Sequence, residues 1–157
     1  MPTACVRVIL DPVPAAPLPD ELTTLTDIIT PNETERAALI GFPVHNLTQA
    51  ERAAKILINR GVKQVIIKKG ARGAYLHDGT AGEKIPGFHV EVLDTTAAGD
   101  AFNGALEVAL EKEKTLGESV RFANAAGALS ATKRGAQPSM PTLAEVEKFL
   151  NIRIENA

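Results

Sequence analysis

A stretch in the middle of the chain, residues 48–67, constrains the fold more than any other feature. Thr48 and Glu51 form a capping-box pair ahead of apolar residues at helical spacing, and Gly61 stands where the helix should end. Residues 65–67 are Val-Ile-Ile, a β-branched run typical of a strand that is buried on both faces. A helix that leads through a short connection into a buried strand predicts an α/β fold with a parallel sheet.

The segments before this stretch predict more elements of the same kind. We expect a buried strand at Val6–Leu10 and a second short apolar stretch at residues 25–30. Asn32 is a good helix N-cap, and with Glu35 three residues later it predicts a helix that ends at about Leu39.

The second half of the chain starts with short strands and ends in helices. From Ala74 on we expect short strands around a turn at Asp78-Gly79 and again at about residues 88–93, so one margin of the sheet should be antiparallel. A chain of 157 residues can bury one ordinary core, so we expect a single domain over residues 1–157. Helical patterns predict three closing helices, at about residues 98–111, 116–132 and 143–150.

Composition narrows the classes of function. A net charge of -2, with acids and lysines interleaved, gives no basic stripe, so no nucleic-acid partner is expected. The single cysteine, Cys5, leaves no internal disulfide and no cysteine-based metal site. The chain has no apolar run near the roughly 20 residues that cross a bilayer and no signal-peptide pattern. We therefore expect a cytoplasmic protein without membrane contact.

The strongest functional signal is a loop of small residues, 94–104, which follows a strand and opens a helix. The backbone N–H groups of Ala97, Ala98, Gly99 and Asp100 should point toward one spot at the positive end of the helix dipole. An anion such as phosphate is expected there, because alanine and glycine let it approach the backbone closely.

Asp100 lies in this same turn, where a carboxylate beside a phosphate needs an explanation. A phosphoryl-transfer enzyme needs a base that takes the proton of the attacking hydroxyl, and Asp100 is placed for that role. Alternatively, Asp94 or Thr96 caps the helix and Asp100 only favours its first turn. The residues alone leave both interpretations open.

The Ala-Ala-Gly-Asp sequence at residues 97–100 resembles the C-terminal signature of the ribokinase, or phosphofructokinase-B, family of carbohydrate kinases. The resemblance extends from about Val6 to the end of the chain. It implies a ribokinase-like three-layer α/β/α sheet, with Asp100 as the catalytic base and the amides of Ala97, Ala98 and Gly99 as an anion hole. It also implies ATP, Mg²⁺ and K⁺ as cofactors.

Two more segments resemble the ATP site of this family. Asn32 and Glu35 match an Asn-x-x-Glu element that orders magnesium and phosphates through water, although the pair also makes a plain capping box. Residues 68–73 resemble the loop over the ATP phosphates and adenosine, although a strand-to-turn connection also explains their glycines, and ribokinases often have threonine and leucine at the first two positions. The resemblance implies nucleotide binding by Lys68, Gly70, Ala71, Arg72 and Gly73.

The last motif implies a monovalent cation. Residues 131–139 resemble a loop that, with the loop at Asp94, encloses potassium in ribokinases. Oxygen ligands suit such a hard cation. Asn124 falls where the family contacts adenine, and a satisfied helical asparagine is the alternative. The implied metal-site residues are Asp94, Thr96, Ala131 and Ser139.

Family members are considerably longer, and their N-terminal half supplies a sugar-binding motif, several strands and a β-lid. We therefore expect this chain to be the C-terminal, nucleotide-binding half of such a fold, without those N-terminal strands and lid, and to have weak ATP binding and little kinase activity alone. The expected partners are ATP and a pentose, with ribose before fructose or a nucleoside, and a second copy of the chain across a sheet edge exposed at residues 6–10. The alternative is a catalytically inactive nucleotide-binding or self-assembling remnant.

Overall fold

The structure of the protein is a computed structural model, and it describes residues 6–155. These residues form two compact units, the first of residues 6–69 and 75–84, the second of residues 70–74 and 85–155. The single domain over residues 1–157 stays a prediction, and Cys5 lies outside the described residues. Within the described part of the chain, no helix is long and apolar enough to cross a membrane.

The first unit carries a sheet of five strands whose order in space follows their order in the chain. The first three strands pair in parallel, as the strand and helix pattern predicted. The last two are joined by the turn at Asp78-Gly79 and form the expected hairpin, in which Asp78 N–H donates to the Ala81 carbonyl over 3.0 Å. The strands are β1 Ile9–Leu10, β2 Ile28–Ile29, β3 Gln64–Lys68, β4 Ala74–His77 and β5 Gly82–Ile85.

Strand β1 lies at one edge of the sheet, as expected, but it is shorter than the predicted buried strand Val6–Leu10. Val6 is 77% exposed and Val8 is 39% exposed, so this part of the prediction is wrong. The backbone N–H of Val8 donates to the Asp27 carboxylate over 2.7 Å, and the Val8 carbonyl accepts the Ile28 N–H over 3.1 Å. Self-association through this edge stays a prediction.

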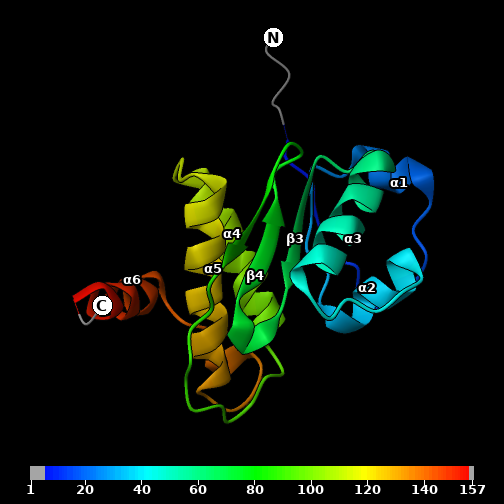
Figure 1. Cartoon of the computed structure of the whole chain (residues 1–157). Coiled ribbons are helices and arrows are strands. Elements are labelled where there is room, and N and C mark those ends of the chain that lie inside the picture. The colour runs from blue at the N-terminus through cyan, green and yellow to red at the C-terminus, as the bar shows by residue number, and fades with distance from the viewer. Residues whose placement is uncertain (1–5, 156–157) are drawn as a thin grey trace. The chain divides into compact units, whose positions relative to one another are not determined.

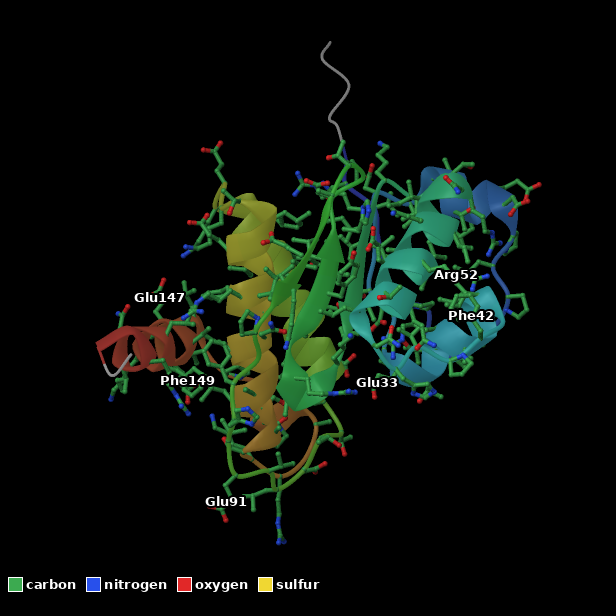
Figure 2. All side chains as sticks on the ribbon, viewed as in Figure 1. Glu33, Phe42, Arg52, Glu91, Glu147 and Phe149 are labelled. Atoms are coloured by element: carbon green, nitrogen blue, oxygen red, sulfur yellow. The ribbon has the colours of Figure 1, made fainter. Side chains whose placement is uncertain are left out.

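Three helices belong to the first unit, and α3 packs against α2 and β3 (Figure 1). Apolar residues of α2 and α3 share one buried cluster with residues of β2, β3 and β4. Figure 2 shows Arg52 of α3 beside Phe42, with the guanidinium carbon 5.0 Å from the ring centre. The helices are α1 Asp20–Leu25, α2 Glu33–Ile40 and α3 Leu47–Asn59.

Two features of these helices differ from the sequence prediction. Helix α3 is capped by Asn46, whose side chain accepts the N–H of Gln49 over 2.8 Å, so the predicted cap at Thr48 is wrong. Both residues are good caps by type, but Asn46 has the extended backbone that a cap needs. Helix α1 was not predicted, because it is short and directly follows a proline-rich loop.

The second unit contains the three predicted closing helices, with α4 and α5 packed side by side (Figure 1). The strand predicted at residues 88–93 is wrong, since no regular strand covers that stretch. Instead, Phe88 packs edge-on against Phe149, with ring centres 5.2 Å apart, in the core of this unit. The helices are α4 Ala98–Glu111, α5 Leu116–Ala131 and α6 Leu143–Glu155, with short 3-10 turns η1 Gly70–Arg72 and η2 Gln137–Ser139.

Candidate active site

The turn before α4 is held by the carboxylate of Asp94. Its Oδ1 atom accepts the Thr96 hydroxyl over 2.5 Å and the Thr96 N–H over 2.9 Å. Its Oδ2 atom accepts the N–H of Gly135 over 2.9 Å. The Thr96 hydroxyl first, then these N–H groups, lower the pKa of Asp94 to about 2. Asp94 is therefore a carboxylate at neutral pH that joins its own turn to the loop after α5.

Helix α4 starts without a side-chain cap. Its N-cap residue is Ala97, and neither Asp94 nor Thr96 caps the helix, so the capping role in the alternative from the sequence is wrong. The N–H of Ala98 is already used, because it donates to a backbone carbonyl one turn earlier over 3.2 Å.

Three N–H groups at this helix start make no hydrogen bond within the described structure, although Ala97 itself is only 1% exposed. Among the described residues, the backbone N–H groups of Ala97, Gly99 and Asp100 have no hydrogen-bond partner. They lie within the first turn, where the helix dipole favours negative charge. The local geometry therefore suits the anion that the sequence predicts.

Asp100 is exposed on the first turn of α4. It borders a pocket of about 170 Å³ within the second unit, otherwise lined mostly by apolar and small residues of α4, α5, α6 and the segment just before α6. An exposed carboxylate can take up a proton and release it to solvent, so Asp100 has the access that a general base needs.

The loop after α5 packs against the Asp94 turn. The carbonyl oxygen of Ala131 accepts the N–H of Leu93 over 2.8 Å and the N–H of Asp94 over 3.2 Å. Ser139 is buried in η2, where its hydroxyl lies 3.0 Å from the Ser130 hydroxyl. The structure thus brings the four residues predicted as a metal site into two adjoining loops.

The loop at residues 70–73 contacts the segment at residues 85–87. A Cβ atom on Gly73, whose φ is +89°, would lie 2.1 Å from the Ile85 carbonyl oxygen and 2.4 Å from the Gly87 nitrogen. Gly70 also has a positive φ, +57°, but open space around it. At Gly73 the close approach is therefore to the protein's own backbone.

Asn124 supports the same segment from α5. Its buried side-chain amide donates to the Pro86 carbonyl over 3.2 Å. This is the satisfied helical asparagine expected as the alternative to an adenine contact. Ala71 and Arg72 are exposed, and their roles toward a nucleotide stay predictions.

The first unit holds the other predicted nucleotide residues. Asn32 and Glu35 form the reciprocal capping box of α2, in which Glu35 accepts the Asn32 N–H over 2.7 Å and its side-chain amide over 2.8 Å. Glu35 is 6% exposed. Lys68 ends β3, and its ammonium group lies 3.1 Å from a carboxylate oxygen of Asp11.

A family model for the pfkB family carbohydrate kinases matches residues 1–143. The chain belongs to the pfkB family. A ribokinase of Haemophilus influenzae is 47% identical over 145 residues, which are 92% of this chain and 47% of that protein. The structure of Arabidopsis thaliana ribokinase complexed with ribose and ATP matches with a TM-score of 0.86 at 40% identity, over 92% of this chain and 47% of that chain.

A third match is a putative ribokinase II of E. coli in complex with ATP and Mg²⁺, with a TM-score of 0.75 and 32% identity, over 85% of this chain and 42% of that chain. These matches confirm the predicted α/β, ribokinase-like fold. The chain spans about half the length of the relatives it matches.

The residues of this pfkB chain fit a hydrated magnesium ion better than one held directly. Within the described residues, no group of three or more His, Cys, Asp or Glu side chains could hold a metal. Glu35 is a buried carboxylate with no ion-pair partner in the described part of the chain, and each of its oxygens keeps a lone pair for water. Mg²⁺ usually keeps several waters and binds through few carboxylates plus phosphates.

Only some of the residues predicted to bind potassium, in the Asp94 turn and the loop after α5, have oxygen lone pairs left for an ion. The Ala131 carbonyl already accepts two N–H groups, so both of its lone pairs are in use. The Oδ2 atom of Asp94 accepts a single N–H, which leaves it a lone pair for a cation. Asp94 therefore suits potassium, while a role for Ala131 would require its two hydrogen bonds to be displaced.

Two residues that shape these sites were not predicted from the sequence. Gly135 holds the Asp94 carboxylate, and its φ of +88° explains why a glycine stands there. Asp11 pairs with Lys68, and the available signal was its position directly after a strand of a parallel sheet.

Proposed function

We propose that this pfkB chain carries the nucleotide site and catalytic base of an ATP-dependent sugar kinase of ribokinase type, which converts D-ribose and ATP to D-ribose 5-phosphate and ADP. The observation that carries the proposal is the start of α4, where three unpartnered N–H groups and the Asp100 carboxylate share one helical turn of the described chain. The identity to ribokinases supports ribose as the acceptor.

In the proposed reaction, Asp100 accepts the proton of the primary hydroxyl while that oxygen attacks the γ-phosphorus. The bond from the γ-phosphorus to the bridging oxygen breaks, and ADP leaves with the electron pair. The N–H groups of Ala97, Gly99 and Asp100 stabilise the charge on the phosphoryl oxygens. A positioned base contributes about 10²–10⁴ in rate, and each such donor about 10²–10³.

The other predicted residues have supporting roles in this proposal. Asn32 and Glu35 would hold magnesium through water, and the ion would neutralise phosphate charge when bound. Asp94 and Thr96 would hold potassium beside the anion-binding turn, together with Ser139. Lys68, Gly70, Ala71 and Arg72 would form the nucleotide contacts that the family resemblance implies, while Gly73 and Asn124 would support this loop through their contacts with residues 85–87.

The first test is calorimetric titration of the chain with a non-hydrolysable ATP analogue, magnesium and potassium. Asp100→Asn should bind the analogue about as well as the wild type, because the substitution removes the base and keeps the backbone donors. Asp94→Ala should weaken binding, because the turn loses its hydrogen bonds to Thr96 and Gly135.

Phosphoryl transfer from radiolabelled ATP to ribose then tests the base. Asp100→Asn should lower the rate by about 10²–10⁴, while Glu107→Gln, which changes an exposed carboxylate further along α4, should leave it unchanged. Absence of analogue binding by the wild type would overturn the nucleotide site. Undiminished transfer by Asp100→Asn would overturn the assignment of the base.

A further inference from the structure

Three polar side chains come from the carboxyl ends of three neighbouring strands in the first unit. Asp11 follows β1, Thr30 follows β2 and Lys68 ends β3. The residue before each of them packs in or against the hydrophobic cluster of this unit. Because side chains alternate along a strand, Asp11, Thr30 and Lys68 lie on the other face of the sheet. The carboxyl ends of parallel strands are the usual place for ligands in α/β folds.

The ion pair between Lys68 and Asp11 is more buried than a surface pair. The Lys68 ammonium nitrogen and an Asp11 carboxylate oxygen are 3.1 Å apart, and the side chains of Lys68 and Asp11 are only 11% and 25% exposed. An ammonium group so far out of solvent needs an anionic partner. In this structure Asp11 is that partner. The Lys68 ammonium carries three N–H donors, so it can also serve a second anion.

Thr30 is independent evidence that a ligand binds at the carboxyl ends of these strands. Its side chain is fully buried, and within the described residues its hydroxyl has no hydrogen-bond partner. The parallel register pairs Leu10 with Ile29, so the next residues, Asp11 and Thr30, are neighbours across the strands. A buried hydroxyl without a hydrogen-bond partner is unfavourable, which indicates that a bound ligand supplies that partner.

We propose that Lys68 and Thr30 bind a phosphate group of a polyphosphate anion, and that Asp11 competes with this phosphate for the Lys68 ammonium and so limits its affinity. The inference rests on the proposed function, in which the polyphosphate belongs to ATP. The mechanism is electrostatic: a phosphate oxygen that reaches Lys68 also meets the fixed negative charge of Asp11. Removing that charge should strengthen binding, and removing the lysine should weaken it.

The test is titration of the full chain with inorganic tripolyphosphate and with the ATP analogue. Asp11→Asn should lower the Kd for both by about fivefold, the effect of one unit charge about 4 Å away in water. Lys68→Met should raise the Kd by at least a similar factor. Thr30→Val, which keeps the shape and removes the hydroxyl, should raise the Kd by about threefold.

The chain offers a matched control pair at the opposite end of the same strands. Lys63 and Asp27 lie 2.6 Å apart, just before β3 and β2. Five residues of strand separate Lys63 from Lys68, or about 16 Å, which is beyond the screening length of roughly 8 Å. Lys63→Met and Asp27→Asn should therefore leave both Kd values unchanged.

A second measurement covers the case in which Asp11→Asn does not fold. On addition of tripolyphosphate to the wild type, the NMR signals of the Lys68 ammonium and the Asp11 carboxyl carbon should shift, while those of Lys63 and Asp27 should not. Unshifted Lys68 and Asp11 signals at saturating tripolyphosphate would refute the competition.

The outcomes separate this inference from the proposed function. Analogue binding that neither Asp11→Asn nor Lys68→Met changes overturns the inference and leaves the proposed function standing. An Asp11→Asn variant that binds more weakly overturns the competing role of Asp11. Failure of both the wild type and Asp11→Asn to bind either anion overturns both proposals. Binding of the analogue without binding of tripolyphosphate, with the expected signs in the variants, identifies the nucleotide as the source of the phosphate.

Discussion

Gly73→Ala should destabilise the chain far more than a single methyl group normally does. An alanine at φ +89° costs about 1–2 kcal/mol for the left-handed backbone alone. The new Cβ atom would also lie 2.1 Å from the Ile85 oxygen, 2.4 Å from the Gly87 nitrogen and 2.6 Å from the Pro86 carbonyl carbon. All three are backbone atoms, so no side chain can rotate away.

The overlap of the new Cβ atom with the backbone can be relieved only if residues 85–87 move. That movement would break the hydrogen bond from Asn124 to Pro86, which contributes about 1 kcal/mol. Backbone strain, the lost hydrogen bond and residual crowding together predict a loss of about 3 kcal/mol or more in the free energy of unfolding.

Gly70→Ala is the matched control, because it lies in the same loop at φ +57° with no atom within 4 Å of its Cβ position. It should lose only the backbone cost of about 1–2 kcal/mol. Urea unfolding followed by far-UV circular dichroism measures both free energies. If the two variants were equally stable, the contact between the two backbone segments would be refuted as the reason for glycine at residue 73.

Three further predictions concern helices and pH. Thr115→Ala should cost about 1 kcal/mol of stability, because its hydroxyl caps α5 by accepting the Glu118 N–H over 3.2 Å, and an unchanged Tm would contradict this. Gly104→Ala should raise Tm by roughly 2–4 °C, since it adds helix propensity to α4 in open space, and a lower Tm would show that the space is not open. The folded pKa of Asp94 is lowered to about 2, so its contribution to stability is complete above the unfolded value of about 3.9 and is lost as pH falls through about 2. The stability difference between wild type and Asp94→Asn, followed by denaturation at several pH values, should therefore be constant near neutrality and shrink in acid, and a difference that changed around pH 7 would refute this assignment.

The correct predictions of secondary structure rest on residues that are close together in the sequence. The capping box at Asn32 is formed as predicted, because it needs only two residues three positions apart. The cap of α3 was misplaced because Asn46 and Thr48 are equivalent by type and only backbone conformation separates them. The stretch at residues 88–93 alternates apolar and polar residues like a strand, but only Phe88 packs into the core of the second unit, and residues 91–93 are exposed.

The contacts that shape the sites were out of reach for sequence patterns. The hydrogen bond from Gly135 to Asp94 joins residues 41 positions apart, and the pair of Lys68 with Asp11 joins residues 57 positions apart. Neither spacing carries a periodic signal, because only the fold brings these residues together. The small-residue loop at 97–100 was informative because every group it needs lies within one helical turn.

The start of α4 has no side-chain cap, unlike four other helices of the described chain, although α1, which begins after Pro19, has none either. In the described structure, side chains cap α2, α3, α5 and α6, in the last case through Thr142. Helix α4 has an alanine at that position and therefore forgoes about 1 kcal/mol that a serine or aspartate could supply. A capping side chain would occupy the N–H groups of the first turn and exclude another anion from them. Because Asp94 is nearby but directs its carboxylate to Thr96 and Gly135 instead, the N–H groups of Gly99 and Asp100 in the first turn of α4 keep no partner, which is the arrangement that a phosphate-binding helix requires.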